Sequence, residues 1–169
     1  MSNNSAKPLV AILMGSKNDW EIMQAAGKIF DEFGVAYEAK VASAHRSPEL
    51  VASFVKSAES RGLEVIIGAA GLAAHLPGVI ASMTLLPVLG VPMHGNAVGG
   101  LDALLAIAQM PGGVPVGTLA IGSHGAKNSA LLAIRILANS RPELRQKLSA
   151  YHEQMAKQIE NETLLSVQS

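Results

Sequence analysis

The segment Ser43-Ala44-His45-Arg46-Ser47-Pro48 places an imidazole beside a permanent cation. Imidazole changes its charge near neutral pH, and a guanidinium binds phosphate or carboxylate groups through parallel hydrogen bonds. Residues Ser47 to Glu49 have an ordinary explanation, because Ser followed by Pro and an acidic residue is typical of a helix start. Such a start requires neither His45 nor Arg46. These two side chains are therefore the first candidates for proton transfer and anion binding.

The segment Gly15-Ser16-Lys17-Asn18-Asp19 has the composition of a turn that leads into a helix. Ser16 or Asp19 can cap that helix, whose first backbone N–H groups lack partners and attract anions. A phosphate group fits such a turn. An ordinary capped turn is nevertheless the simpler explanation of the same residues, so this segment alone does not establish a ligand site.

A third segment, Gly68 to Gly78, is rich in small residues and contains His75. Small residues let the backbone approach a ligand closely, so that a flat base or a ribose can lie against them. The same composition suits close packing of a helix on a strand, and His75 is explained equally well as a hydrogen-bonded structural histidine. His94, His124 and His152 are expected to be non-catalytic.

No metal site is predicted. No two His residues have the helical i, i+4 spacing with an acidic partner that a zinc-binding helix needs, and no Asp-rich calcium loop is present. Cys is absent, which excludes disulfides, thiolate metal sites and a cysteine nucleophile. The candidate chemistry therefore rests on His, Arg, Ser and Asp side chains.

Each of the three candidate segments follows a short apolar run that is typical of a β-strand. Such runs alternate with helical patterns and cover residues 9–14, 36–42, 65–67, 86–89 and 117–121. Their nearly continuous apolar character is typical of parallel strands with helices on both faces. We therefore predict a doubly wound α/β fold with a five-stranded parallel sheet. Ligands bind beyond the carboxyl ends of such strands, where the three segments should meet.

The rest of the chain is expected to complete one domain over residues 1–169, with a polar tail at residues 1–7. Two more helices are predicted, at residues 125–139 and 141–163. The last one lies outside the repeat of strands and helices, and its apolar stripe of Leu148, Tyr151 and Met155 suggests packing against another subunit. The loop at residues 110–115 is either a mobile flap or a plain turn.

The composition limits the partners that the chain can have. Lys and Arg total 13, as do Asp and Glu, so no net field favours nucleic acid or an anionic membrane, and neither is expected as a partner. The first residues contain no apolar signal core, and every apolar run is interrupted before about 18 residues. A cytoplasmic protein is therefore expected.

Four ordered motifs resemble the phosphoribosylaminoimidazole carboxylase family, in its branch of 5-(carboxyamino)imidazole ribonucleotide mutases. The motifs are Met14 to Trp20, Ser43 to Arg46, Ala73 to Gly78, and the run from Gln109 to Gly122. The resemblance implies a flavodoxin-like three-layer α/β/α sandwich and a homo-octamer with shared active sites. It also implies an isomerase of purine biosynthesis that moves a carboxyl group from an exocyclic nitrogen to ring carbon four, without a cofactor or a metal.

The resemblance further assigns residues to a pocket for the small ribonucleotide substrate. His45 would be the general acid and base, with Ser16 and Arg46 near the phosphate. The residues expected to bind the substrate are Ser16, Asp19, Ser43, Arg46, Gly71, His75 and Leu76. Two positions depart from the family pattern, because Asn18 replaces a usual Ser and Leu72 replaces a usual Gly. Both can alter ligand contacts while leaving His45 in place.

Other functions suit the same fold. A response-regulator receiver or a flavin carrier shares this strand count, but a receiver needs a phosphorylatable Asp after the third strand, where Gly and Ala stand. A stress-type nucleotide-binding protein is a second alternative, because Gly122 to Gly125 can wrap a phosphate near a helix start. Within the enzymes, the alternative is the related carboxylase, which uses free carbon dioxide.

Overall fold

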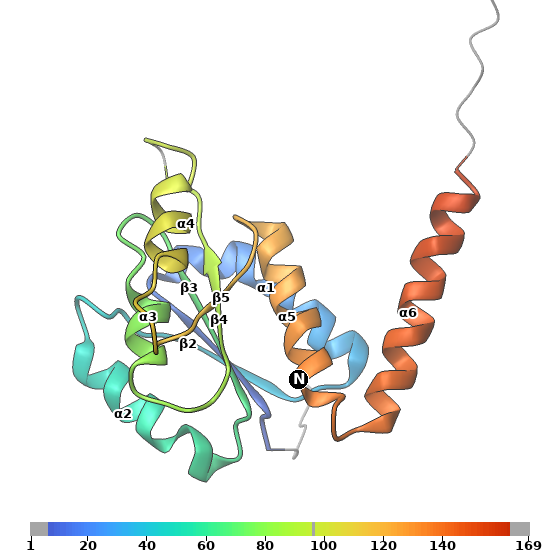
Figure 1. The fold of residues 1–169 in the computed structure, drawn as a ribbon, viewed down its shortest axis with the longest axis horizontal. Coiled ribbons are helices and arrows are strands. Elements are labelled where there is room, and N and C mark those ends of the chain that lie inside the picture. The colour runs from blue at the N-terminus through green and yellow to red at the C-terminus, as the bar shows by residue number, and fades with distance from the viewer. Residues whose placement is uncertain (1–6, 96, 163–169) are drawn as a thin grey trace, which may run out of the picture. The chain divides into compact units, whose positions relative to one another are not determined.

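The computed structural model describes residues 7–95 and 97–162 (Figure 1). Most of the predicted polar tail at residues 1–7 therefore lies outside the described residues, as does Thr163 at the predicted end of the last helix. The chain forms two compact units, one that ends at Ile134 and one that begins at Arg135. The expectation of one domain over the whole chain stays a prediction.

The first unit contains a five-stranded parallel sheet in the order β2-β1-β3-β4-β5. This order confirms the predicted doubly wound, flavodoxin-like α/β fold, because the chain winds outward from β1 in both directions. The strands are β1 (Val10–Met14), β2 (Tyr37–Val41), β3 (Val65–Ala70), β4 (Val88–Pro92) and β5 (Gly117–Thr118).

Helices cover both faces of the sheet (Figure 1). One face carries α2 (Pro48–Ala58), α3 (Leu76–Ala81) and α4 (Leu101–Ala108). The other face carries α1 (Trp20–Phe33) and the first turns of α5 (Ser123–Leu137). Every residue of β1, β3 and β4 is buried, as expected for parallel strands between two helical layers.

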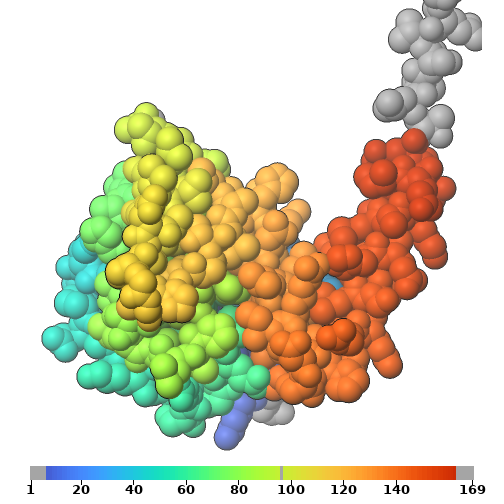
Figure 2. Space-filling model, in the orientation of Figure 1, coloured from blue at the N-terminus to red at the C-terminus, as the bar shows by residue number. Residues whose placement is uncertain are grey.

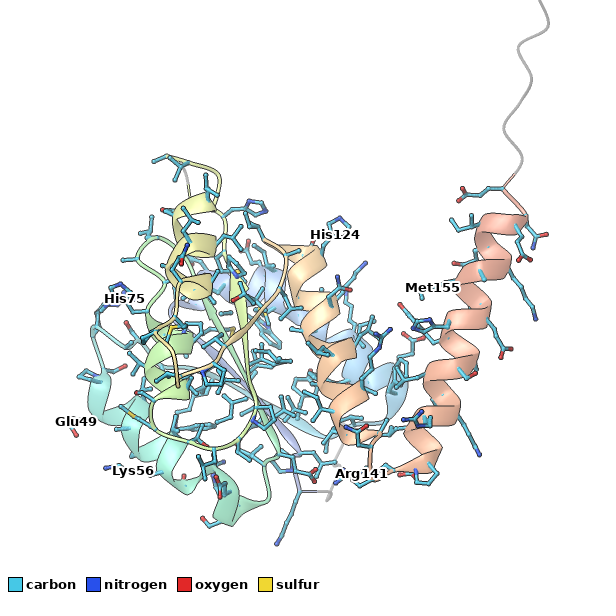
Figure 3. The ribbon with its side chains drawn as sticks, viewed as in Figure 1. Glu49, Lys56, His75, His124, Arg141 and Met155 are labelled. Carbon is cyan, nitrogen blue, oxygen red and sulfur yellow. The ribbon has the colours of Figure 1, made fainter. Side chains whose placement is uncertain are left out.

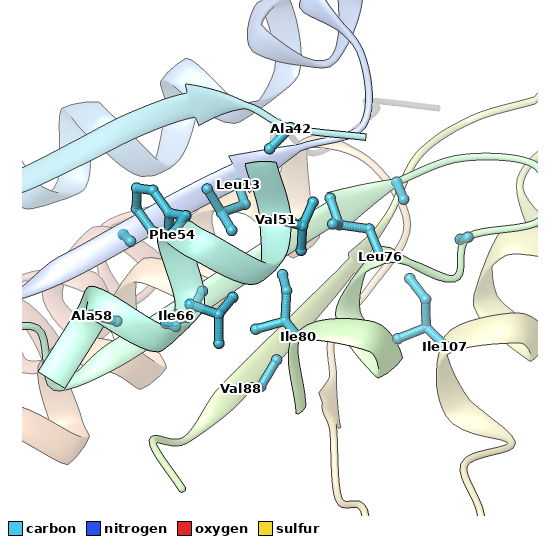
Figure 4. Packing of buried hydrophobic residues seen from close by; sticks show 14 of the residues in the cluster. Leu13, Ala42, Val51, Phe54, Ala58, Ile66, Leu76, Ile80, Val88 and Ile107 are labelled. Atoms are coloured by element: carbon cyan, nitrogen blue, oxygen red, sulfur yellow. The ribbon is translucent and has the colours of Figure 1, made fainter. Parts of the chain in front are cut away.

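A hydrophobic cluster fills the space between the sheet and the layer of α2, α3 and α4 (Figure 4). Leu13 and Ile66 supply its sheet side, while Val51, Ile80 and Ile107 come from the three helices, and all five side chains are fully buried. Burying a side chain of this size contributes roughly 1.5 to 3 kcal/mol. The cluster therefore fixes the strand ends from which the candidate segments emerge.

The predicted bounds of strands three and four, residues 65–67 and 86–89, were wrong, because both strands continue through a glycine, and β4 begins only at Val88. Gly68 and Gly90 are paired neighbours inside β3 and β4. A Cβ atom on Gly90 would lie 2.3 Å from Cγ2 of Ile107, and one on Gly68 would lie 3.1 Å from Cα of Pro77. Glycine is needed at both positions since α3 and α4 lie directly on the sheet.

The fifth strand is shorter than predicted. Only Gly117 and Thr118 pair with β4, at the open edge of the sheet. In the loop before it, the backbone N–H of Val114 donates to the carbonyl of Pro111 at 3.2 Å, which closes a turn. Whether this loop also moves as a flap stays a prediction.

The second unit contains the end of α5 and α6 (Pro142–Glu160), which matches the predicted last helix up to Glu160. Leu144 is buried on this helix, whereas Met155 is 39% and Ile159 is 67% exposed. Within the unit, Arg135 Nη2 lies 2.7 Å from His152 Nε2. Among the described residues, no helix combines the length and the apolar character that crossing a bilayer requires.

Candidate active site

The carboxyl edge of the sheet carries a cavity of about 580 Å³, called here the site cavity. It lies where the loops after β1, β2 and β3 meet, as the strand pattern predicted. The structure brings all of the predicted site residues to its wall: Ser16, Asp19, Ser43, His45, Arg46, Gly71, His75 and Leu76. Asn18 and Leu72, the two departures from the family pattern, line it as well.

The loop after β1 is held by hydrogen bonds that join Ser16 to Asp19 and Asn18 to Ser16. The Ser16 backbone N–H donates to Asp19 Oδ2 at 2.8 Å, and the Asn18 backbone N–H donates to Ser16 Oγ at 3.3 Å. The capping interpretation of this turn is therefore confirmed. Since Ser16 Oγ acts as an acceptor, its own O–H can donate to a ligand in the cavity.

Burial raises the pKa of the Asp19 carboxyl above its ordinary value. The backbone N–H of Ser16 and the positive charge of Arg46 lower the pKa of Asp19, but they only partly offset the loss of solvent. An ionised carboxyl that has lost hydrogen bonds from water is stabilised by a ligand that donates hydrogen bonds to it, such as a sugar hydroxyl.

Arg46 is tied to two loops of the site cavity. Its Nη2 donates to the carbonyl oxygen of Gly15 at 2.6 Å, and its Nε donates to Ser43 Oγ at 3.3 Å. The Arg46 backbone N–H donates to the same hydroxyl at 3.2 Å. Ser43 is 9% exposed, so the hydroxyl that accepts these two hydrogen bonds from Arg46 is nearly buried. The guanidinium is thus positioned before any anion arrives.

Sequence reasoning missed the role of Ser47, which it explained as a helix cap. Ser47 does precede α2, but its side chain makes no capping bond. Its Oγ instead accepts from the backbone N–H of Ser43 at 2.9 Å and donates to the Ser43 carbonyl at 3.1 Å. Ser47 therefore closes the loop that presents His45 and Arg46. No signal in the sequence distinguishes this use of a serine hydroxyl from a cap.

His45 and His75 form a direct pair although 30 positions separate them. Nε2 of His45 lies 2.8 Å from Nδ1 of His75, and the two rings meet edge to face at 81°. One nitrogen must carry the hydrogen while the other accepts it, so the pair links the tautomers of both rings. Figure 3 shows His75 at the start of α3, beside the loop that leads into α2.

The loop after β3 forms the third wall. Gly71 has no room for a side chain without displacement, because a Cβ atom there would lie 3.3 Å from Cβ of Met93. Leu76 is 2% exposed, so it closes the cavity floor while belonging to the core. Leu72 is 63% exposed and has a positive φ of 56°.

Met93 and His94, from the loop after β4, also line the site cavity, and no site prediction included them. The position of His94 just beyond a strand end was the available signal. Its ring packs against Gly122, where a Cβ atom would lie 2.4 Å from His94 Nε2. His124, labelled at the start of α5 in Figure 3, is not among the residues that line the cavity.

A larger hollow of about 760 Å³ lies near the amino ends of β4 and β5. Among the described residues that line it, Glu59 is the only one with an ionisable side chain, so size alone does not identify the functional site. Over residues 7–95 and 97–162, no group of three or more His, Asp or Glu side chains is placed to hold a metal ion. The groups suited to acid and base chemistry converge at the site cavity.

Comparison with known proteins gives a consistent result. The family model described as AIR carboxylase matches residues 9–158. A Saccharolobus solfataricus protein is 57% identical over 152 residues, with 90% of this chain and 95% of that protein covered. An Escherichia coli protein is 51% identical over 159 residues, which is 94% of each chain. Both are named N5-carboxyaminoimidazole ribonucleotide mutase.

The same relationship extends to a solved structure. The crystal structure of Treponema denticola PurE superimposes with a TM-score of 0.80 at 29% sequence identity, and the match covers 90% of this chain and 94% of that one.

Proposed function

Because the chain belongs to the AIR carboxylase family, we propose that it is a mutase of purine biosynthesis. It converts 5-(carboxyamino)imidazole ribonucleotide into 4-carboxy-5-aminoimidazole ribonucleotide. The names of relatives that are more than 50% identical over most of the chain support this reaction. The observation that carries the proposal is the paired imidazole of His45, which lies beside the anchored Arg46 in one cavity.

The ribonucleotide is bound by the two loops that Arg46 joins. Arg46 and the Ser16 hydroxyl face the phosphate, since both present donors at the cavity wall. Asp19 accepts from the ribose hydroxyls, and Ser43 keeps Arg46 in place while bordering the substrate. Gly71, His75 and Leu76 enclose the imidazole ring. Binding energy from the remote phosphate then holds the ring against His45.

The reaction needs one proton shuttle. His45 gives a proton to the exocyclic nitrogen while the bond from that nitrogen to the carboxyl carbon breaks, and the bond electrons stay on nitrogen as carbon dioxide leaves. Carbon four of the electron-rich ring then attacks the carbon dioxide and forms the new carbon–carbon bond. His45 finally takes the proton that carbon four held. The proton count is unchanged, so neither a cofactor nor a metal is part of the scheme.

His75 supports both proton transfers. When its Nδ1 accepts from Nε2 of His45, the Nδ1 of the neutral His45 ring is left with a lone pair. The same contact stabilises His45 when its ring is protonated, because a charged donor forms the stronger hydrogen bond. The pair therefore suits a residue that alternates between acid and base.

A homo-octamer in the cytoplasm is the remaining part of the proposal. Supporting it, Val98, Leu101 and Leu105 on and before α4 are each 50% or more exposed. Figure 2 shows α4 at the surface of the first unit, in yellow. Exposed apolar groups of this size are typical of subunit contacts. A phosphorylated substrate does not cross membranes freely, which favours the cytoplasm.

The second candidate is the carboxylase reaction, which the name of the family model favours. That enzyme would join free carbon dioxide to the uncarboxylated ribonucleotide. The test supplies purified protein with the carboxyamino ribonucleotide, or with the aminoimidazole ribonucleotide and bicarbonate at physiological concentration. A mutase turns over the first far better, after subtraction of the spontaneous reaction. Equal efficiency with both would assign the chain to the carboxylases.

A further inference from the structure

Leu72 has an unusual backbone conformation for its residue type. It is the one non-glycine residue with a positive φ among residues 7–95 and 97–162, at 56°. A leucine there brings its Cβ close to the following carbonyl oxygen, so the left-handed conformation is unfavourable for it. Such strain collects at functional sites, where the surrounding structure enforces it.

The residues on both sides of Leu72 are held by hydrogen bonds or by packing. The Leu72 carbonyl accepts from the Ala74 backbone N–H at 2.8 Å, and the Ala73 carbonyl accepts from the His75 N–H at 2.8 Å. On the other side, Gly71 is packed against Met93. Leu72 therefore lies between the packed Gly71 and the hydrogen-bonded turn that presents His75.

Packing within the chain does not offset the strain, because Leu72 is 63% exposed. Its Cδ2 lies 3.4 Å from the place where a Cβ on Gly95 would stand, so the side chain reaches toward the loop after β4. The other apolar groups of the cavity wall are small or buried, such as Ala44 and Leu76. Leu72 is the large exposed apolar side chain on that wall.

We propose that Leu72 is an apolar cover of the site cavity that keeps the transient carbon dioxide from exchanging with solvent. This inference rests on the proposed mutase function. Carbon dioxide carries no charge and makes only weak hydrogen bonds, so an apolar wall retains it while polar donors do not hold it. Compared with the hydrogen atom of a glycine, the leucine side chain narrows the opening of the site cavity beside His75 and limits the entry of water.

The test measures the exchange directly. Unlabelled carboxyamino ribonucleotide is converted in buffer that contains ¹³C-labelled carbon dioxide and bicarbonate, and the label in the product is measured by mass spectrometry. The parent protein should incorporate little label. Leu72→Ala and Leu72→Gly should each incorporate severalfold more, since escaped carbon dioxide is replaced from the buffer. Leu85→Ala is the matched control, because Leu85 is 97% exposed but lies on the other hollow.

The two variants also distinguish the covering role of the Leu72 side chain from the backbone strain at this residue. Leu72→Gly relieves the strain of the left-handed backbone, whereas Leu72→Ala keeps a Cβ atom there. The glycine variant should therefore unfold at the higher urea concentration of the two. Both variants should incorporate the same amount of label. Labelling equal to the parent in both variants would overturn the proposal, as would a parent that already exchanges freely. A changed oligomeric state would make Leu72 a subunit contact instead. A parent that transfers no carboxyl group would refute the proposed function itself.

Discussion

Replacing Ser47 with alanine tests whether the loop that carries His45 is held by the Ser47 side chain. The substitution removes two hydrogen bonds, from the Ser43 N–H at 2.9 Å and to the Ser43 carbonyl at 3.1 Å. The carbonyl keeps a partner, since it also accepts from the Ser47 backbone N–H at 2.9 Å. The Ser43 N–H loses its acceptor, and because Ser43 is only 9% exposed, water does not readily replace it.

The size of the effect follows from that unsatisfied donor. Leaving a buried polar group without a partner costs about 1 to 3 kcal/mol, so Ser47→Ala should lower the free energy of unfolding by about 2 kcal/mol. Ser53→Ala is the matched control, because the Ser53 hydroxyl bonds only to the Leu50 carbonyl on the exposed side of the same helix. Its effect should stay within about 0.5 kcal/mol.

Urea unfolding gives the stability, and steady-state kinetics gives the consequence for the site. Because the loop also positions Arg46, Ser47→Ala should reduce kcat/KM for the carboxyamino ribonucleotide by more than Ser53→Ala does. Equal stability and equal kcat/KM in the two variants would refute the reasoning, since Ser47 would then be an ordinary residue at a helix start.

Three further predictions concern the other walls of the cavity. Arg46→Ala should weaken binding of the ribonucleotide by about 1.5 to 3 kcal/mol, which is roughly tenfold to 150-fold in Kd by calorimetry, and an unchanged Kd would exclude the phosphate role. His75→Ala should lower kcat more than it changes Kd, because His75 acts through His45; a change in Kd alone would make it a binding residue. For Asp19, the raised pKa means that folding favours the protonated carboxyl. Its contribution to stability is complete below the ordinary value of 3.8 and is lost as the pH rises through the folded pKa. The stability of the parent relative to Asp19→Asn should therefore fall over that range in urea titrations, and a rise would show that the sign is wrong.

The sequence predicted the parallel sheet, its doubly wound topology and the edge that carries the site. These features could be predicted because apolar periodicity and the loops after strands are visible within short segments of the chain. It also selected His45 and Arg46 from a single segment. The contact between His45 and His75 joins distant segments, so no local pattern could indicate it. The errors at Gly68 and Gly90 have the same origin, since their need for glycine comes from helices that pack on the strands.

Ser47 and Leu72 show a second limit of sequence reasoning. A serine before a proline is typical of a helix cap, yet the hydroxyl of Ser47 serves a neighbouring loop. Leucine is seldom left-handed, so nothing in the residue type predicts the conformation of Leu72. In both cases the tertiary surroundings decide between uses that the residue type leaves open.

The most direct test of the central claim is the activity of His45→Asn. Asparagine keeps a polar side chain at the wall but cannot transfer a proton near neutral pH. General acid and base catalysis contributes about 100-fold to 10,000-fold, and His45 serves both halves of the reaction, so carboxyl transfer should fall by about 10,000-fold or more. Binding of the ribonucleotide, measured by calorimetry, should persist. A loss of no more than about tenfold, which is below the lower end of that range, would contradict the account and show that His45 is not the shuttle.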